Sequence, residues 1–98
     1  MSFPLAFRAV AQAEFNRAAR RYESQRLGLG NDFVNEVQRV LDNIASQPDR
    51  YSIAYRDVRE AIVNRFPYCV YYRERANRVV VIAVFHTSRD PAIWQSRV

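Results

Sequence analysis

The chain has 98 residues, enough for one domain over residues 1–98, and its composition of 49% hydrophobic and 26% charged residues is ordinary for a soluble globular protein. No apolar run approaches the roughly 18 residues of a membrane span, and no secretory signal opens the chain, so we expect a cytoplasmic protein. The net charge of +5 comes from 15 arginines and no lysine, and such an excess suits nucleic acid, an acidic protein partner, or both.

Two helices are predicted in the N-terminal half, after a short strand over residues 3–8 in which Pro4 favours an edge position. Residues 10–26 carry apolar side chains at helical spacing. Residues 32–46 carry a cleaner stripe. Its members are Phe33, Val37, Val40, Leu41 and Ile44.

Turn residues define the boundaries of these helices. Gly28 and Gly30 are expected to end the first helix, Asn31 to cap the second, and Pro48 to end it. Because only a few residues join the two helices, we expect an antiparallel hairpin with one shared apolar face.

The periodicity then changes to that of strands. Strands are predicted over residues 58–66, 68–73 and 79–86, with residues 74–78 as the polar loop of a hairpin. The run 79–85 is apolar at both parities, so it should be a central strand covered on both faces. Since the helical hairpin can cover only one face, we expect a partner chain to cover part of the other.

The C-terminal residues complete the predicted fold. Asp90 is placed to cap a last short helix that carries Trp94 as a core or interface anchor. The neighbours Tyr71 and Tyr72 should point to opposite faces of the sheet, one into the core and one to the surface or an interface. The predicted class is α+β, with an N-terminal helical hairpin packed on a small antiparallel sheet and a short C-terminal helix.

Several kinds of chemistry find no support in the residues. Two glycines cannot build a phosphate-binding loop, and the single histidine, His86, lacks a hydrolase motif around it. The lone Cys69 excludes an internal disulfide and a Cys/His zinc site, and is expected to be a small apolar strand residue. We therefore expect no metal and no cofactor.

The remaining candidate site lies in the C-terminal half, where residues 51–98 hold eight arginines against four acidic residues. It consists of Arg65, His86, Arg89, Trp94 and Arg97. Three consecutive segments resemble the end of RelE/ParE toxins. They are the run Arg-Phe-Pro-Tyr-Cys-Val-Tyr-Tyr-Arg over residues 65–73, a Val-rich strand, and His-Thr-Ser-Arg-Asp-Pro-x-x-Trp-x-x-Arg over residues 86–97. The N-terminal half also resembles this family. It has a predicted helix, then Leu-Gly-Leu-Gly over residues 27–30, a second helix and Pro48.

This resemblance implies the toxin component of a type II toxin–antitoxin system, with plasmid stabilisation and growth arrest as its effects. It also implies a cognate antitoxin that binds and blocks the toxin. One branch of the family, ParE-like, inhibits DNA gyrase; the other, RelE-like, cleaves mRNA on the ribosome. A third alternative is an inactive member that only binds its antitoxin.

Residue chemistry favours the gyrase branch, with a target-binding surface that includes the five residues of the candidate site. Metal-independent RNA cleavage needs a proton acceptor, a donor and positive charge at the phosphate, for which Arg65, His86 and Arg89 are the candidates. However, Cys69 stands where RNase members carry an arginine, and Thr87 stands where a related branch has tyrosine.

Overall fold

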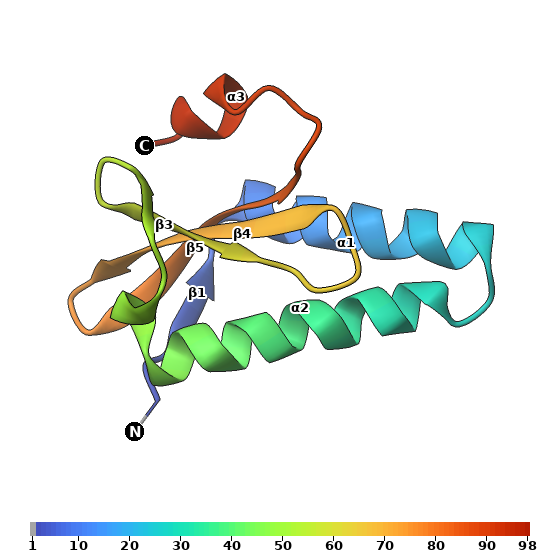
Figure 1. The fold of residues 1–98 in the computed structure, drawn as a ribbon, viewed down its shortest axis with the longest axis horizontal. Helices are drawn as coiled ribbons and strands as arrows, with labels where there is room; N and C mark the ends of the chain where they lie inside the picture. The colour runs from blue at the N-terminus through green and yellow to red at the C-terminus, as the bar shows by residue number, and fades with distance from the viewer. Residues whose placement is uncertain (1) are drawn as a thin grey trace.

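The N-terminal half of the chain forms an antiparallel pair of long helices (Figure 1). The computed structural model describes residues 2–98, in which α1 spans Ala9–Gln25 and α2 spans Leu29–Ser46. Phe33, Val37 and Ile44 of α2 are fully buried against the sheet and α1, as the apolar stripe predicted. The predicted helical hairpin is therefore confirmed.

The turn between the helices differs from the prediction. Gly28, with a φ of 89°, is the N-cap of α2, so Asn31 lies inside the helix and the predicted Asn31 cap is wrong. The carboxylate of Glu23 in α1 accepts hydrogen bonds from the backbone N–H groups of Gly28 and Gly30, at 2.9 and 3.0 Å, in place of a local cap. A Cβ at Gly30 would lie 2.5 Å from the carbonyl oxygen of Ala19, so glycine at this position lets the helices approach closely.

Five strands form one sheet in the order β1-β5-β4-β3-β2. The strands are β1 (Leu5–Phe7), β2 (Ile53–Tyr55), β3 (Val58–Ile62), β4 (Tyr68–Arg75) and β5 (Arg78–His86), with a 3-10 turn, η1, at Pro48–Arg50 before β2. Every neighbouring pair is antiparallel except β1 and β5, which run parallel. The sheet confirms the predicted α+β class, and β1 lies at its edge as Pro4 indicated.

Some predicted strand boundaries were wrong. The strand expected over residues 58–66 ends at Ile62, because the chain turns through Arg65, whose φ is 72°. β4 and β5 extend further than expected, so the hairpin turn consists only of Ala76 and Asn77, both with positive φ. The strand β2 was not predicted, since three residues are too few for an alternating pattern to be recognised.

β5 is a central strand that is covered on both faces, as its apolar run predicted. Its residues Val79, Val81 and Val84 face the helices. Ile82, Ala83 and Phe85 face the opposite side. The alternation changes at Ile82, which is the extra residue of a β-bulge opposite Tyr71 and Tyr72. Because of this bulge, the last residues of β5 turn the side chains of Val84 and His86 toward α1.

The face opposite the helices is covered by the chain's own C-terminal segment, which corrects the expectation that a partner chain would be needed there. The helix α3 (Ala92–Gln95) lies over this face (Figure 1). Trp94 of this helix is 2% exposed. Its ring stacks on Tyr71 with 4.0 Å between centroids and 18° between planes. Tyr71 is therefore buried, where one tyrosine of the pair had been expected at the surface, and Cys69 is buried beside it.

The described part of the chain, residues 2–98, contains no helix long and apolar enough to cross a bilayer. It also contains no group of three or more histidine, cysteine or acidic side chains placed to hold a metal ion.

Candidate functional site

A buried carboxylate joins α1, β5 and the C-terminal segment. Glu14 of α1, whose side chain is 5% exposed, accepts a hydrogen bond from the backbone N–H of Val84 at 3.1 Å. Arg97 donates to both of its oxygens, at 3.0 and 2.9 Å, and Arg89 donates to one of them at 3.0 Å. Two charged partners and a backbone donor therefore satisfy a carboxylate that would be costly to bury alone.

Further contacts fasten the C-terminal segment to the body of the protein. The guanidinium groups of Arg89 and Arg97 lie 4.2 and 5.7 Å from the ring centroid of Phe85. Arg97 also donates to the carbonyl of Ile82, and Arg8 donates to the carbonyl of Arg97 at 2.9 Å. Asp90 accepts a hydrogen bond from the first N–H of α3, as its predicted capping role requires.

A surface pocket of about 410 Å³ opens beside this junction, between α1 and the end of β5. Its lining residues are Glu14, Arg17, Ala18, Arg21, Tyr22, Gln25, Tyr68, Val84, His86, Ser88 and Arg89. Three of these are arginines, and the single acidic residue among them is Glu14. We call this hollow the α1 pocket.

Tyr68 forms part of the wall of the α1 pocket. The Arg21 guanidinium donates to its hydroxyl at 2.5 Å, and its ring meets the His86 ring edge to face at 5.1 Å. Burial raises the pKa of Tyr68 above its ordinary value, although the charge of Arg21 opposes this. The phenol therefore keeps its proton at neutral pH and is available as a donor.

His86 is held in one orientation by the residue two positions later. Its Nδ1 accepts a hydrogen bond from the backbone N–H of Ser88 at 3.0 Å, with the Ser88 hydroxyl 2.7 Å away. Because a backbone N–H can only donate, Nδ1 must present its lone pair, and the neutral ring carries its proton on Nε2.

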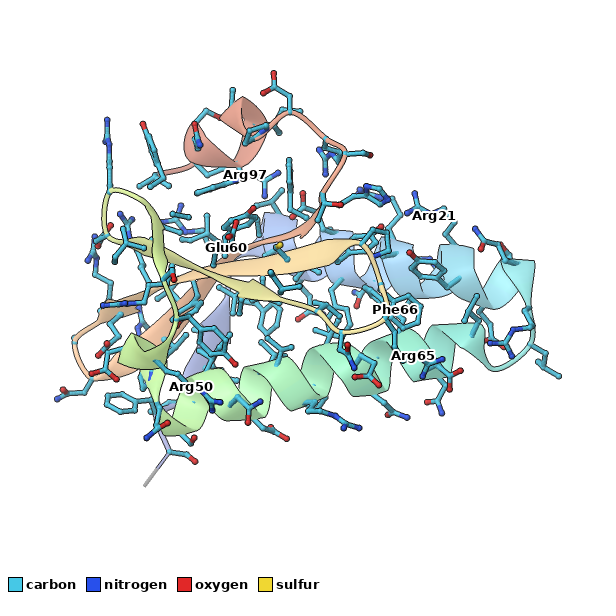
Figure 2. All side chains as sticks on the ribbon, viewed as in Figure 1. Arg21, Arg50, Glu60, Arg65, Phe66 and Arg97 are labelled. Carbon is cyan, nitrogen blue, oxygen red and sulfur yellow. The ribbon has the colours of Figure 1, made fainter. Side chains whose placement is uncertain are left out.

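The structure brings some of the predicted site residues together and separates others. His86 and Arg89 share the α1 pocket, and Arg97 meets Arg89 at Glu14. Arg65 does not line that pocket, and Figure 2 shows it beside α2. Its guanidinium lies 3.8 Å from the carboxylates of both Asp32 and Glu36 on that helix. Trp94 lies on the sheet face opposite the helices. It belongs there to a second core formed by Val58, Cys69, Tyr71, Ile82, Ala83, Phe85 and Trp94.

Three residues of the site on α1 were missed by sequence reasoning: Glu14, Arg17 and Arg21. One signal was present, because Glu14 stands three residues after Ala11 and four before Ala18, on the buried stripe of α1. An acidic residue on an apolar stripe indicates a buried ionic partner. The partners, Arg89 and Arg97, are 75 and 83 residues away in the sequence, so no local pattern identifies them.

The opposite face of the sheet offers little catalytic chemistry. Cys69 is 5% exposed, and burial raises the pKa of its thiol, with the nearby charge of Glu60 adding to the effect. The hydroxyl of Tyr71 donates to Glu60 at 3.0 Å, and burial raises the pKa of this phenol too. Both groups stay protonated at neutral pH, so neither provides a nucleophile or a base.

Comparison with known proteins identifies the family. Residues 5–91 match the family described as the ParE toxin of the type II toxin-antitoxin system, parDE. The chain belongs to the ParE toxin family. A solved structure titled as a chromosomal ParDE toxin–antitoxin system from P. aeruginosa has a similar fold. It aligns with a TM-score of 0.64 at 13% identity, over 89% of this chain and 98% of that one. No curated protein sequence matches the chain.

Membership in the ParE family supports a toxin role for this chain and implies an antitoxin partner. The matched region contains Glu14, the α1 pocket and Arg89, but ends at Pro91. Trp94 and Arg97, which fasten the C-terminal segment, lie beyond it.

Proposed function

We propose that this ParE-family toxin arrests growth by binding and inhibiting DNA gyrase in the cytoplasm, and that a cognate antitoxin neutralises it. Family membership supplies the toxin role. The observation that favours binding over RNA cleavage is the apolar filling of the sheet face beneath Trp94, where Cys69, Tyr71 and Phe85 are all buried.

RNase members of the wider family would use this sheet face differently. The position where they carry an arginine is occupied by Cys69, which faces the second core. The His86 ring packs against Tyr68 and lines the α1 pocket. Cys69 and His86 both line a second surface pocket of about 330 Å³ beside Trp94, but the position where an RNase would carry an arginine holds a buried thiol there. This arrangement supports a toxin that acts as a binding protein.

Two exposed arginines, Arg65 beside α2 and Arg89 in the segment after β5, are suited to a macromolecular target. Arg65 and Arg89 have side chains that are 54% and 41% exposed, and each keeps donors beyond those used by its carboxylate partners. His86 adds a partly exposed donor. We assign Trp94 and Arg97 an indirect role, since both are largely buried and hold the segment that presents Arg89.

The antitoxin should be acidic in its toxin-binding part, because residues 51–98 have a net charge of +4. Charge complementarity mainly raises the association rate, whereas apolar contacts slow dissociation. We expect the association rate to fall clearly between low and high salt in surface plasmon resonance, with a much smaller change in dissociation. A salt-independent association rate would show that the arginines serve another purpose.

Expression in bacteria tests the proposed mechanism. The toxin alone should stop growth, cause filamentation and induce the DNA-damage response while transcripts stay intact, and co-expression of the neighbouring antitoxin gene should restore growth. Codon-positioned cuts in ribosome-bound mRNA would instead establish the RNase mechanism. Normal growth with soluble, folded toxin present would identify an inactive member.

A further inference from the structure

The α1 pocket gathers more hydrogen-bond donors than the protein itself uses. Donors enter it from three parts of the chain: guanidinium groups from α1, the Tyr68 hydroxyl from the start of β4, and Ser88 and Arg89 from the residues after β5. The neutral His86 ring, whose Nδ1 is occupied, has Nε2–H as its remaining donor.

The charge balance of the pocket is positive. Glu14 is its only acidic lining residue, and that carboxylate is already paired with Arg89 and Arg97. Arg21 donates to the neutral hydroxyl of Tyr68 and lies 5.9 Å from the ring centroid of Tyr22, and it forms no ion pair within residues 2–98. Arg17 makes no side-chain hydrogen bond or ion pair within residues 2–98. Two guanidinium charges thus face a hollow of about 410 Å³ with no anion of the protein to balance them.

We propose that the α1 pocket binds a phosphate group of a nucleic-acid backbone. Donors that approach from three directions suit a tetrahedral phosphate, whereas a planar carboxylate is satisfied by a single guanidinium fork. The tyrosine rings at the pocket are engaged by the protein itself, because Tyr68 is buried and Tyr22 is partly buried against Phe33 and Tyr68. The contact is therefore to the backbone and is independent of base sequence.

A matched pair of variants on one helix tests this assignment. Arg17→Gln removes a pocket arginine, and Arg20→Gln removes the same charge from the same helix at an exposed position that does not line the pocket. Binding of a fluorescein-labelled 20-nucleotide single-stranded DNA is followed by fluorescence anisotropy at several salt concentrations. Arg17→Gln should weaken binding roughly tenfold and lower the salt slope by about one, equally for unrelated base sequences. Arg20→Gln should change affinity by less than about twofold.

The position of the contact is tested separately by NMR titration with inorganic phosphate and with the oligonucleotide. Both ligands should shift the Ser88 amide and the His86 ring signals, and Arg17→Gln should weaken both responses. Shifts with phosphate alone would mean a site for free phosphate only, and would overturn the assignment to a nucleic-acid backbone.

Other results would also contradict the proposal. Equal losses in the Arg17→Gln and Arg20→Gln variants would show that only overall charge matters. Binding of an acidic peptide in the pocket, with no response to the oligonucleotide, would assign it to a protein partner. These experiments contain no gyrase, so their outcome is independent of whether the proposed gyrase inhibition is correct.

Discussion

The two faces of the sheet are built in different ways. The face toward α1 and α2 rests on a continuous apolar cluster in which Phe33 meets Phe15, Tyr22, Phe66 and Tyr68 at ring distances of 5.0 to 6.0 Å. The other face is covered by one four-residue helix and one indole ring, and Arg89 and Arg97 tie this C-terminal segment to Glu14 of α1. Apolar burial is shared among many residues on the first face, while the second depends on a few contacts with the end of the chain.

Because of this difference, one face should determine the stability of the whole domain, and the other should determine how the C-terminal segment is held. Removing any one group from the helical face leaves a cavity in a packed core, so the whole domain loses stability. Removing a contact from the other face frees the C-terminal segment, which carries Arg89 toward the α1 pocket. We therefore expect contacts on the helical face to determine global unfolding, and contacts on the other face to determine local opening of the C-terminal segment.

The largest effect is expected from Phe33→Ala. This side chain is fully buried and contacts four other aromatic rings, so its removal should cost about 4 kcal/mol of unfolding free energy. Urea denaturation followed by circular dichroism measures the change. Since a domain of this size has a total stability of about 5–15 kcal/mol, much of it should be lost. A loss below about 1 kcal/mol would contradict the role given to this cluster.

Trp94→Ala should have the next largest effect, about 3 kcal/mol, because the indole is buried but α3 can move away and leave little cavity. Hydrogen exchange should rise mainly in residues 88–98, with the helices remaining protected. The matched control is Ile93→Ala, whose side chain is 43% exposed and which should cost less than about 0.5 kcal/mol. Equal effects at the two positions would mean that α3 is not anchored by the indole.

Glu14→Gln tests the ionic part of the junction. The side-chain amide oxygen of the variant can still accept a hydrogen bond from the Val84 N–H. The loss of the negative charge leaves the largely buried Arg97 without a charged partner. We expect a cost of about 2 kcal/mol in urea denaturation, smaller than for a fully buried pair since Arg89 can turn to water. A double-mutant cycle with Arg97→Gln should show strong coupling, and additive losses would argue against the direct pair.

The smallest effect concerns pH. Hydrogen bonds from Arg73, together with Arg75, lower the pKa of Asp57 from 3.8 to about 2. The stabilisation is therefore complete above the unfolded pKa and disappears as the pH falls from about 4 to 2. Because this carboxylate is 46% exposed, the contribution is at most about 1 kcal/mol. Asp57→Asn should flatten the pH dependence of stability in that window, and an unchanged slope would contradict the assignment.

The fold was largely predictable because its main elements follow local patterns. The α2 stripe and the doubly apolar β5 fixed the helical hairpin and the central strand. The capping of α2 by Glu23 was not predictable, since the acceptor comes from the preceding helix, where no local motif marks it. The packing of the C-terminal segment on the second face was not predicted, because nothing in a four-residue helix indicates locally that its indole will stack on Tyr71.

The candidate site was predicted only in part. His86 and Arg89 were correctly placed near each other, since only Thr87 and Ser88 separate them after the end of β5. Arg65 was grouped with them on chemistry alone, but Asp32 and Glu36 of α2 hold it elsewhere. Arg17 and Arg21 resembled an ordinary charged helix face, and only the tertiary packing of α1 against β5 places them at a pocket.

The central claim, that this toxin acts by binding gyrase, is tested most directly with purified components. Gyrase, relaxed plasmid and ATP are incubated with increasing toxin, and supercoiled and cleaved DNA are measured by gel electrophoresis. We predict that supercoiling falls, that cleaved DNA accumulates, and that purified antitoxin reverses both effects. Unchanged supercoiling at toxin concentrations that stop growth in cells would contradict the account.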